Sequence, residues 1–285
     1  MICTITHETR YVYAKPVFLE PQTIRLRPRS DTTQSLLRFT LEINPRPAGC
    51  SHILEPDGNA VATVWFSTHQ SLFVVTSHST VETLQSNPFD YLLEAEAERL
   101  PITYRPLLAE RLAPFYGQYT AGPAVASLVA ELQNQTNSKT VAFLMALNNR
   151  LNASIQPLTR LSGDPFSPEE TLSRGEGACR DVTTVFMSAC DTVGLATRFI
   201  SGYHIADALN GRQELHAWAE VYLPGAGWRG YDPSLGLVVA DRHVAVAAGP
   251  SHRHVRPVEG SYRGEGAPVE MTTAVRIESA DLPDS

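Results

Sequence analysis

The first 85 residues of the chain alternate apolar and polar side chains with a period of two, which restricts what they can fold into. Between positions 37 and 43 every second residue is apolar. That period buries one face of a strand and leaves the other in water. A Pro-Asp-Gly-Asn turn signal at 56–59 is followed by apolar stretches over 61–66 and 72–75. Several short strands separated by turns predict a small β-sandwich over residues 1–85.

Residues 86–122 have a different composition, in which prolines punctuate aromatic and acidic residues. This pattern predicts an extended connector laid over the surface. Beyond it, apolar residues recur at three- and four-residue spacing over 124–132 and 139–151. That spacing predicts two amphipathic helices. We therefore expect a second domain over residues 123–285.

Composition and charge exclude several classes of protein. The chain has 285 residues, 43% of them hydrophobic, which is enough apolar content for real cores. Its net charge is −7 with no run of Lys or Arg, so nucleic acid and anionic membranes are poor partners. No stretch approaches the ~20 apolar residues of a membrane span, and no secretory signal opens the sequence. The four cysteines form no CxxC pair, so we expect no structural zinc and reduced thiols in a cytoplasmic protein.

A cysteine stands at the start of a predicted helix in the second domain. A short helix begins at Ser167-Pro168 and stops in the glycine-rich turn 174–177. Cys179 then opens an apolar-faced helix that ends at Gly194. Three strands are expected after it, with a polar loop between the first two and a tight turn between the last two: 197–203, 215–223 and 228–231.

Cys179, His216 and Asp232 each lie at the end of a predicted element, in the order of a nucleophilic triad. A thiol near neutral pH needs help to ionise, and a helix N-terminus and a neighbouring imidazolium both favour thiolate. A carboxylate on the far nitrogen of the imidazole fixes its tautomer. A tight turn joins the strands of His216 and Asp232, so the strands should pair antiparallel and bring the two side chains close together. The spacing along the chain does not establish that they lie near Cys179. One alternative stays open, that Cys179 is a buried structural cysteine and the His and Asp are unrelated to it. A metal site is a weaker alternative, because the three residues include no closely spaced pair of ligands.

Five segments of the second domain closely resemble the bacterial transglutaminase-like family, whose members are described as cysteine proteases. They are GEGACRD at 175–181, GLATRFISGY at 194–203, HAWAEVYLPG at 216–225, GW at 227–228 and YDP at 231–233. The resemblance covers residues 125–285, and the β-rich start is similar to the N-terminal region of these bacterial proteins. It implies an α+β fold, with an N-terminal β-sandwich followed by a papain-like core of helices packed on an antiparallel sheet.

The resemblance also implies a reaction, which is acyl transfer from a peptide or protein amide without metal or cofactor. Cys179 matches the nucleophile, His216 the general base and acid, and Asp232 the residue that orients the histidine. The thioester would pass to water or to an amine, and we favour water because nothing in the sequence excludes it. The backbone N–H of Cys179 would hold the oxyanion, with Gln118 as a candidate second donor. A small-amine acyltransferase and a non-catalytic binding module of the same fold remain as alternatives.

Three further residues have both a functional and a structural interpretation. Arg180 follows the nucleophile and Trp218 shares a strand face with His216, so both are candidate substrate contacts. Arg180 could equally belong to the first turn of its helix, and Trp218 to the core. His243 lies in a segment that is also similar to the family, so it could border the cleft or be a partly buried structural histidine.

Overall fold

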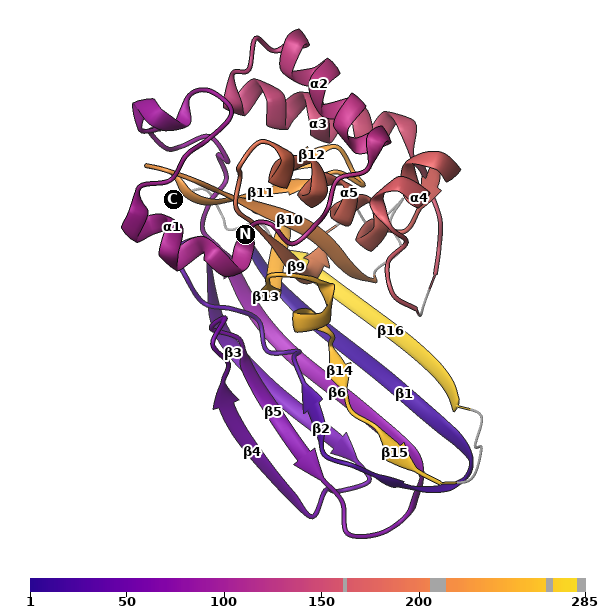
Figure 1. Cartoon of the computed structure of the whole chain (residues 1–285). Coiled ribbons are helices and arrows are strands. Elements are labelled where there is room, and N and C mark those ends of the chain that lie inside the picture. The colour runs from indigo at the N-terminus through magenta and orange to yellow at the C-terminus, as the bar shows by residue number, and fades with distance from the viewer. Residues whose placement is uncertain (161–162, 206–213, 265–268, 281–285) are drawn as a thin grey trace.

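The computed structural model describes residues 1–160, 163–205, 214–264 and 269–280. Helices gather at one end of the molecule, a second antiparallel sheet lies beneath them, and long strands form the other end (Figure 1).

The long strands form the predicted β-sandwich, which has two antiparallel sheets. The first has the order β15-β1-β6-β3, with β16 also paired to β1. The second has the order β14-β2-β5-β4. The strands are β1 (Ile2–Leu19), β2 (Gln22–Ile24), β3 (Gln34–Asn44), β4 (Gly49–Leu54), β5 (Ala60–Trp65), β6 (Gln70–Thr83), β14 (Val258–Glu259), β15 (Tyr262–Arg263) and β16 (Val269–Ala280). Apolar side chains of both sheets, among them Val17, Val64 and Phe73, share one core. The expectation of a sandwich is confirmed.

The alternation predicted over 37–43 is interrupted at its first residue. The pairing of β3 with β6 shifts register between Leu36 and Arg38, and Leu37 is left 52% exposed. Phe39 and the alternate residues after it are partly buried as expected. A bulge adds one residue to the strand and so turns a side chain out of the pattern.

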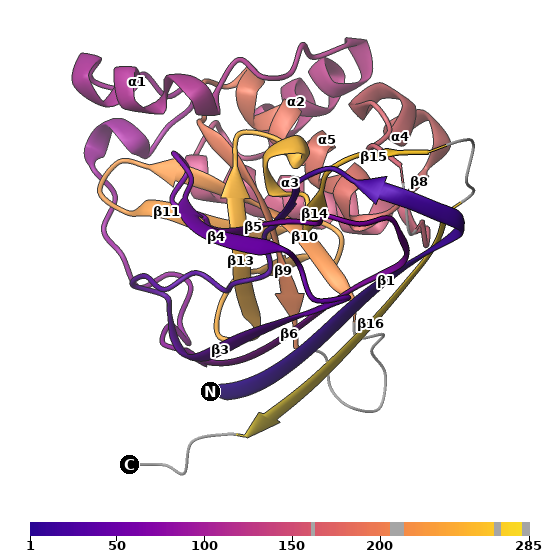
Figure 2. The ribbon, with the colours of Figure 1, turned by 90° about the horizontal axis from the view of Figure 1, so that it is seen from below.

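The boundary of the second domain was wrong at its C-terminal end. Strand β16 pairs with β1 from Ile2↔Ala280 to Tyr13↔Val269, and β14 and β15 pair with β2 and β1. The two long strands run side by side in Figures 1 and 2. Residues 258–259, 262–263 and 269–280 therefore complete the sandwich instead of ending the second domain.

The connector is less extended than predicted. It contains the short helices η1 (Ala95–Ala97), α1 (Pro106–Leu112) and η2 (Ala113–Phe115). Pro106 at the first helical position starts α1, where a missing N–H costs nothing. Ala97, Ile102 and Leu112 are buried in the core of the second domain, so the connector contributes to that core.

The second domain is built on a five-stranded antiparallel sheet of order β12-β11-β10-β9-β13. Its strands are β9 (Thr197–His204), β10 (Leu215–Leu223), β11 (Gly227–Asp232), β12 (Leu237–Val238) and β13 (His243–Gly249). Its helices are α2 (Pro123–Gln135), α3 (Thr140–Ser154), α4 (Pro168–Arg174), α5 (Cys179–Thr192) and η3 (His252–Val255), with a small parallel pair of β7 (Gln156–Pro157) and β8 (Glu176–Gly177). The α+β core of helices on an antiparallel sheet is confirmed. The polar loop expected between β9 and β10 lies mostly outside the described residues.

The core sheet is covered on both faces. Helix α5 packs on β9 and β10, and α2, α3 and α4 surround it (Figure 1). On the other side, Tyr203 and Val244 of the core sheet share a buried cluster with Ile5 and Val81 of the sandwich. None of the helices in the described ranges is long and apolar enough to cross a bilayer.

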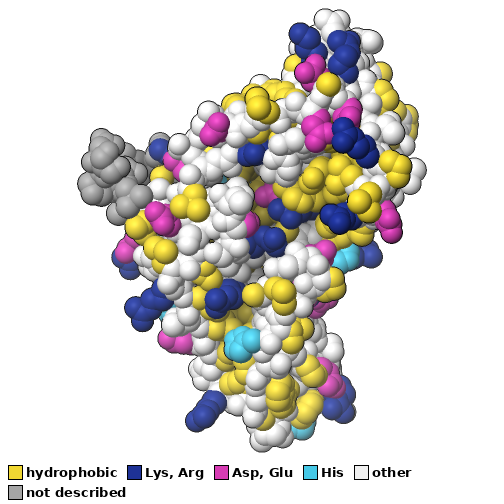
Figure 3. Space-filling view, turned by 90° about the vertical axis from the view of Figure 1, so that its left-hand side faces the viewer, with side chains coloured by type: hydrophobic (Ala, Val, Ile, Leu, Met, Phe, Trp, Pro, Cys, Tyr) yellow, Lys and Arg dark blue, Asp and Glu magenta, His cyan; other side chains and the backbone are white. Residues whose placement is uncertain are grey.

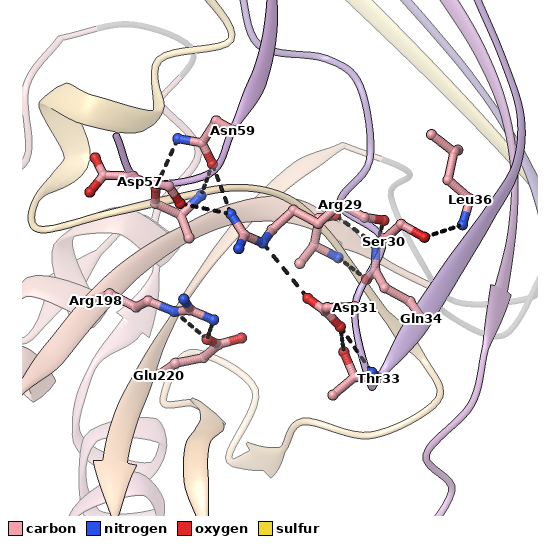
Figure 4. Close-up of polar contacts among 12 residues, drawn as sticks. Arg29, Ser30, Asp31, Thr33, Gln34, Leu36, Asp57, Asn59, Arg198 and Glu220 are labelled. Atoms are coloured by element: carbon pink, nitrogen blue, oxygen red, sulfur yellow. Dashed lines mark hydrogen bonds and ion pairs between the residues drawn. The ribbon is translucent and has the colours of Figure 1, made fainter. Parts of the chain in front are cut away.

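Two side-chain amides of the sandwich bind the edge of β13. The Gln34 amide donates to the carbonyl of Ala245 at 2.9 Å and accepts from its N–H at 2.7 Å. Asn59 makes the same reciprocal pair with Ala248, both bonds being 2.9 Å long. Figure 4 shows Gln34 and Asn59 on either side of Arg29, close to the Arg198–Glu220 ion pair of the core. Backbone groups of an edge strand are thus satisfied by side chains.

Substituting Asn59 tests this contact. Asn59→Ala should lower the free energy of unfolding by about 1–3 kcal/mol, because the buried N–H and carbonyl of Ala248 both lose their partner. Denaturant unfolding followed by circular dichroism measures it. Asn87→Ala is the matched control, since within the described part of the chain the Asn87 side chain accepts one hydrogen bond, from the Phe89 N–H in an exposed turn. Equal effects of the two substitutions would contradict the role assigned to Asn59.

Candidate active site

Cys179 is the first residue of α5, at the end of a glycine-rich turn. Gly175 closes α4 with a φ of 65°, the left-handed region that glycine adopts readily. Ala178 caps α5, and its N–H donates to Oδ2 of Asp181 at 2.7 Å. The thiol is half-buried. The predicted placement of Cys179 at a helix N-terminus is confirmed.

Asp181 holds the turn before Cys179 against the loop before α4. Its second oxygen, Oδ1, accepts from Nη2 of Arg160 at 2.6 Å and from the N–H of Phe166 at 2.9 Å. The Arg160 guanidinium lies 3.8 Å from the centre of the Phe166 ring. Asp181 is fully buried, so this network fixes the backbone immediately before Cys179.

His216 and Asp232 meet at one edge of the core sheet. Antiparallel pairing of β10 and β11 aligns Ala219 with Tyr231, which brings the start of β10 beside the end of β11. Nε2 of His216 lies 2.6 Å from Oδ2 of Asp232. Nδ1 is thereby left to face the thiol of Cys179, whose side chain is near enough to raise the pKa of His216. His216 therefore interacts with both Cys179 and Asp232.

The electrostatics of the site favour a charged imidazole. Burial lowers the pKa of His216, but the charge and hydrogen bond of Asp232, with a smaller contribution from Cys179, outweigh it and raise that pKa to about 10. Burial raises the pKa of Asp232, but His216 and His243 outweigh it and hold that pKa well below its usual range. An ionised Asp232 beside a protonated His216 is the expected state at neutral pH.

Asp232 is fully buried, and both of its oxygens accept hydrogen bonds. Oδ1 accepts from the Ser234 hydroxyl at 2.7 Å and from the N–H groups of Ser234 and Leu235 at 3.2 Å. Oδ2 accepts a hydrogen bond from Nε2 of His243 at 3.1 Å, in addition to the one from His216. A buried carboxylate with this many donors cannot rotate without breaking several of them.

His204 is a member of the site that the sequence analysis missed. It is the cross-strand partner of His243 in the pairing of β9 with β13, and the two rings lie 4.8 Å apart. Burial, together with the neighbouring His243 and His216, lowers the pKa of His204 to about 4. The strand predicted from the sequence ended one residue earlier, at Tyr203. In the described ranges, no group of three or more His, Cys, Asp or Glu side chains is arranged to hold a metal ion.

Comparisons with known proteins agree with this geometry. The model of the transglutaminase-like superfamily matches residues 125–233, and that of the bacterial transglutaminase-like N-terminal region matches residues 3–82. This chain belongs to the transglutaminase-like superfamily.

Relatives of similar length match most of this chain. "Uncharacterized protein ML0607" of Mycobacterium leprae is 25% identical over 283 residues, 96% of this chain and 97% of the relative. "Uncharacterized protein Rv2569c" of Mycobacterium tuberculosis is 24% identical over 269 residues, 90% of this chain and 86% of the relative. A crystal structure from Cytophaga hutchinsonii, described as a "putative cysteine protease", covers 100% of this chain and 92% of its own with 18% identity and a TM-score of 0.72. That structure has the same transglutaminase-like fold.

Trp218 of this transglutaminase-like chain is a core residue instead of a substrate contact. It is 1% exposed and packs with Ile200, Ala245 and Ala248. It does share a strand face with His216, whose ring centre is 6.3 Å away. Gly202 lies opposite His216 on β9, and a Cβ there would approach the Trp218 ring to 2.5 Å. The glycine therefore makes room for the tryptophan behind the site.

Arg180 lies in the first turn of α5, as its structural interpretation expected, whereas Gln118 differs from its expected role. Nη1 of Arg180 donates to the carbonyl of Arg160 at 2.8 Å, so Arg180 helps to hold the loop before α4. The N–H of Gln118 donates to Asp191 at 2.9 Å. Asp191 lies at the far end of α5, about 18 Å from Cys179 at 1.5 Å per residue. Gln118 as an oxyanion donor was wrong, because residues 117–119 bind the opposite end of the helix.

Proposed function

We propose that this chain is a cysteine-dependent enzyme that transfers the acyl group of an amide, with water as the preferred acceptor. The observation that carries the proposal is that one imidazole, His216, bonds to the Asp232 carboxylate at 2.6 Å and also interacts with Cys179, which helps to raise its pKa. This arrangement of nucleophile, base and orienting carboxylate supports covalent catalysis. The family to which the chain belongs supports the same chemistry.

The reaction would proceed in two steps. The Cys179 thiolate attacks the amide carbonyl, the C–N bond breaks, and Nδ1–H of His216 protonates the leaving amine. Water then attacks the thioester while His216 accepts its proton, the C–S bond breaks, and the carboxylic acid leaves as the thiol group returns. The backbone N–H of Cys179 lies in the first turn of α5, where N–H groups have no intrahelical partner, so it is available to the oxyanion.

The class of substrate follows from the chemistry and the surface. On the face seen in Figure 3, acidic and basic side chains are interspersed, without the broad basic surface that nucleic acid prefers. We propose a peptide or protein amide as the substrate. The nucleophile and the other three cysteines are free thiols, which favours a reducing compartment such as the cytoplasm.

The four cysteines make alkylation by iodoacetamide a decisive first experiment. At pH 6, Cys179 should react at least about tenfold faster than the exposed Cys50, because the buried carboxylate of Asp232 holds the imidazole beside Cys179 in its charged form and Cys179 also lies at a helix N-terminus. Cys3 and Cys190 should stay silent, since burial raises the pKa of Cys3 to about 11 and that of Cys190 well above its usual value. Peptide mapping by mass spectrometry gives each rate.

The dependence on pH has a defined sign. The raised pKa of His216 means that its charge is complete below neutral pH and is lost as pH rises through about 10. The advantage of Cys179 over Cys50 should therefore be largest near pH 6 and shrink as pH approaches about 8.5, where ordinary thiols also ionise. His216→Ala should abolish it at pH 6. His52→Ala is the control, because His52 lies beside the other exposed thiol, 3.7 Å from Cys50, and it should leave the Cys179 rate unchanged.

A Cys179 that reacts no faster than Cys50 in the folded protein would overturn the proposal and favour a binding module. If Cys179 is reactive, peptide amides with and without an added primary amine distinguish the two acceptors. New termini without isopeptide bonds support hydrolysis. Isopeptide products alone would contradict our preference for water.

A further inference from the structure

Asp232 has a second imidazole on the same oxygen that meets His216. Nε2 of His243 lies 3.1 Å from Oδ2, and Nε2 of His216 lies 2.6 Å from it. The two histidines come from different strands, β13 and β10, which are separated in the sheet by β9. The sequence left two interpretations of His243, a residue that borders the cleft and a partly buried structural histidine. Its side chain is 2% exposed, as the structural interpretation expects, and it points at the carboxylate.

The hydrogen-bond pattern fixes the tautomer of His243. A carboxylate is acceptor only, so Nε2 of His243 must carry a proton. Nδ1 is buried and has no hydrogen-bond partner within the described part of the chain. A proton there would be a buried donor without an acceptor, which is costly. His243 therefore donates through Nε2 and adds a second imidazole hydrogen bond to the oxygen of Asp232 that meets His216.

The ring of His243 is held on two sides. His204 lies 4.8 Å from it on one strand, and Trp218 meets it edge to face at 5.2 Å. The strand that carries it, β13, is bound along its edge by the Gln34 and Asn59 amides of the sandwich. A ring fixed in this way can set the direction of a carboxylate, whereas a mobile one could not.

We propose that His243 is a positioning residue of the reaction: through its Nε2–H it fixes Oδ2 of Asp232 where that oxygen can orient His216 toward Cys179. The inference rests on the proposed function and adds to it a residue that does not touch the substrate. Small errors in the placement of catalytic groups can cost about 10²-fold in rate. Loss of the His243 donor should therefore slow Cys179 without changing how substrate binds.

The experiment compares two substitutions at this position by the pH-dependent alkylation of Cys179. His243→Leu fills the space and removes the donor, whereas the amide of His243→Gln can replace Nε2–H. We expect His243→Leu to lower the Cys179 rate at pH 6 by about 10-fold to 100-fold, and His243→Gln to restore most of it. With a peptide substrate, kcat should fall and KM stay constant. His7→Leu is the control, because His7 is 1% exposed and bonds to Tyr203 but not to the triad.

The outcomes separate this inference from the proposed function. A slow Cys179 in the wild-type protein would overturn both. A fast Cys179 in wild type that stays as fast in folded His243→Leu would overturn only the positioning role. Equal losses in His243→Leu and His243→Gln, with the same loss in His7→Leu, would also overturn it, since they would reflect stability alone.

A measurement on the unmodified protein covers the case in which His243→Leu fails to fold. Nitrogen-15 NMR of the histidine rings reports which nitrogen carries the proton. The inference requires a protonated Nε2 and an unprotonated Nδ1 on His243 at pH 7. A proton on Nδ1 alone would overturn it.

Discussion

Replacing Asp232 by Asn should lower the turnover of an amide substrate by about 10³–10⁴-fold while the protein stays folded. The reason lies in the donors around this side chain. Backbone N–H groups of Ser234 and Leu235 point at one oxygen, and the Nε2 atoms of His216 and His243 face the other. An amide can satisfy the backbone donors with its oxygen, but its NH₂ group then faces both imidazoles.

His216 would have to become an acceptor at Nε2 to meet that NH₂ group. Its proton would move to Nδ1, the atom beside Cys179, where the neutral ring can no longer take the proton of the thiol. The negative charge that raises the pKa of His216 would be lost at the same time, and burial would then lower that pKa. Both effects leave Cys179 as an ordinary thiol.

Turnover of a peptide amide and alkylation of Cys179 at pH 6 measure the effect. Asp191→Asn is the matched control. Asp191, like Asp232, accepts hydrogen bonds from backbone N–H groups, three in its case, but it lies at the other end of α5. That variant should lose stability and keep a fast Cys179. A fast Cys179 in Asp232→Asn would show that the carboxylate does not orient His216.

Asp181→Ala should lower the free energy of unfolding by about 3–5 kcal/mol, the typical cost of breaking a buried ion pair from one side. The substitution removes the acceptor of Arg160 Nη2 and of the N–H groups of Phe166 and Ala178. The Arg160 side chain, 21% exposed, would remain as a largely buried charge. Urea unfolding measures the loss, and the turn before Cys179 should lose its order with it.

Glu170→Ala provides the comparison on the neighbouring helix. Glu170 pairs with Arg174 one turn away, with side chains 42% and 46% exposed, and exposed pairs of this kind contribute about 0.3–0.5 kcal/mol. We expect a loss of that size or less. If Asp181→Ala lowers the free energy of unfolding no more than Glu170→Ala does, the buried network does not stabilise the turn before Cys179.

Local signals predicted the elements that carry Cys179, His216 and Asp232. The cap at Ser167 accepts from the N–H of Glu170 at 3.2 Å, and strand β10 has the predicted bounds of 215–223. The tight turn at 224–227 joins β10 to β11 and leads to the contact of His216 with Asp232. Caps, turns and strand periods depend on residues close in sequence, so one sequence contains them.

The contacts of His204, His243 and the C-terminal strand depend on pairing between distant segments. No spacing along the chain states that β13 lies beside β9, so a second histidine on Asp232 could not be derived. Strand β16 did leave a signal in the sequence, since four apolar residues fall on alternate positions of one strand face, interrupted by Thr273: Val269, Met271, Val275 and Ile277. That period predicts a strand but not its partner. The predicted domain boundary therefore failed where the pairing was non-local.

The pairing of β1 with β16 has a consequence for how the molecule is made. When β1 leaves the ribosome, one of its edges has no partner, because that edge pairs with residues 269–280. Those residues are synthesised after nearly the whole remaining chain. At about 5–20 residues per second, that edge waits for tens of seconds. An unpaired strand edge binds other strands readily, so a nascent or truncated chain is open to aggregation at β1. Strand β16 is thus the last strand to be made and also the one that covers the open edge of β1.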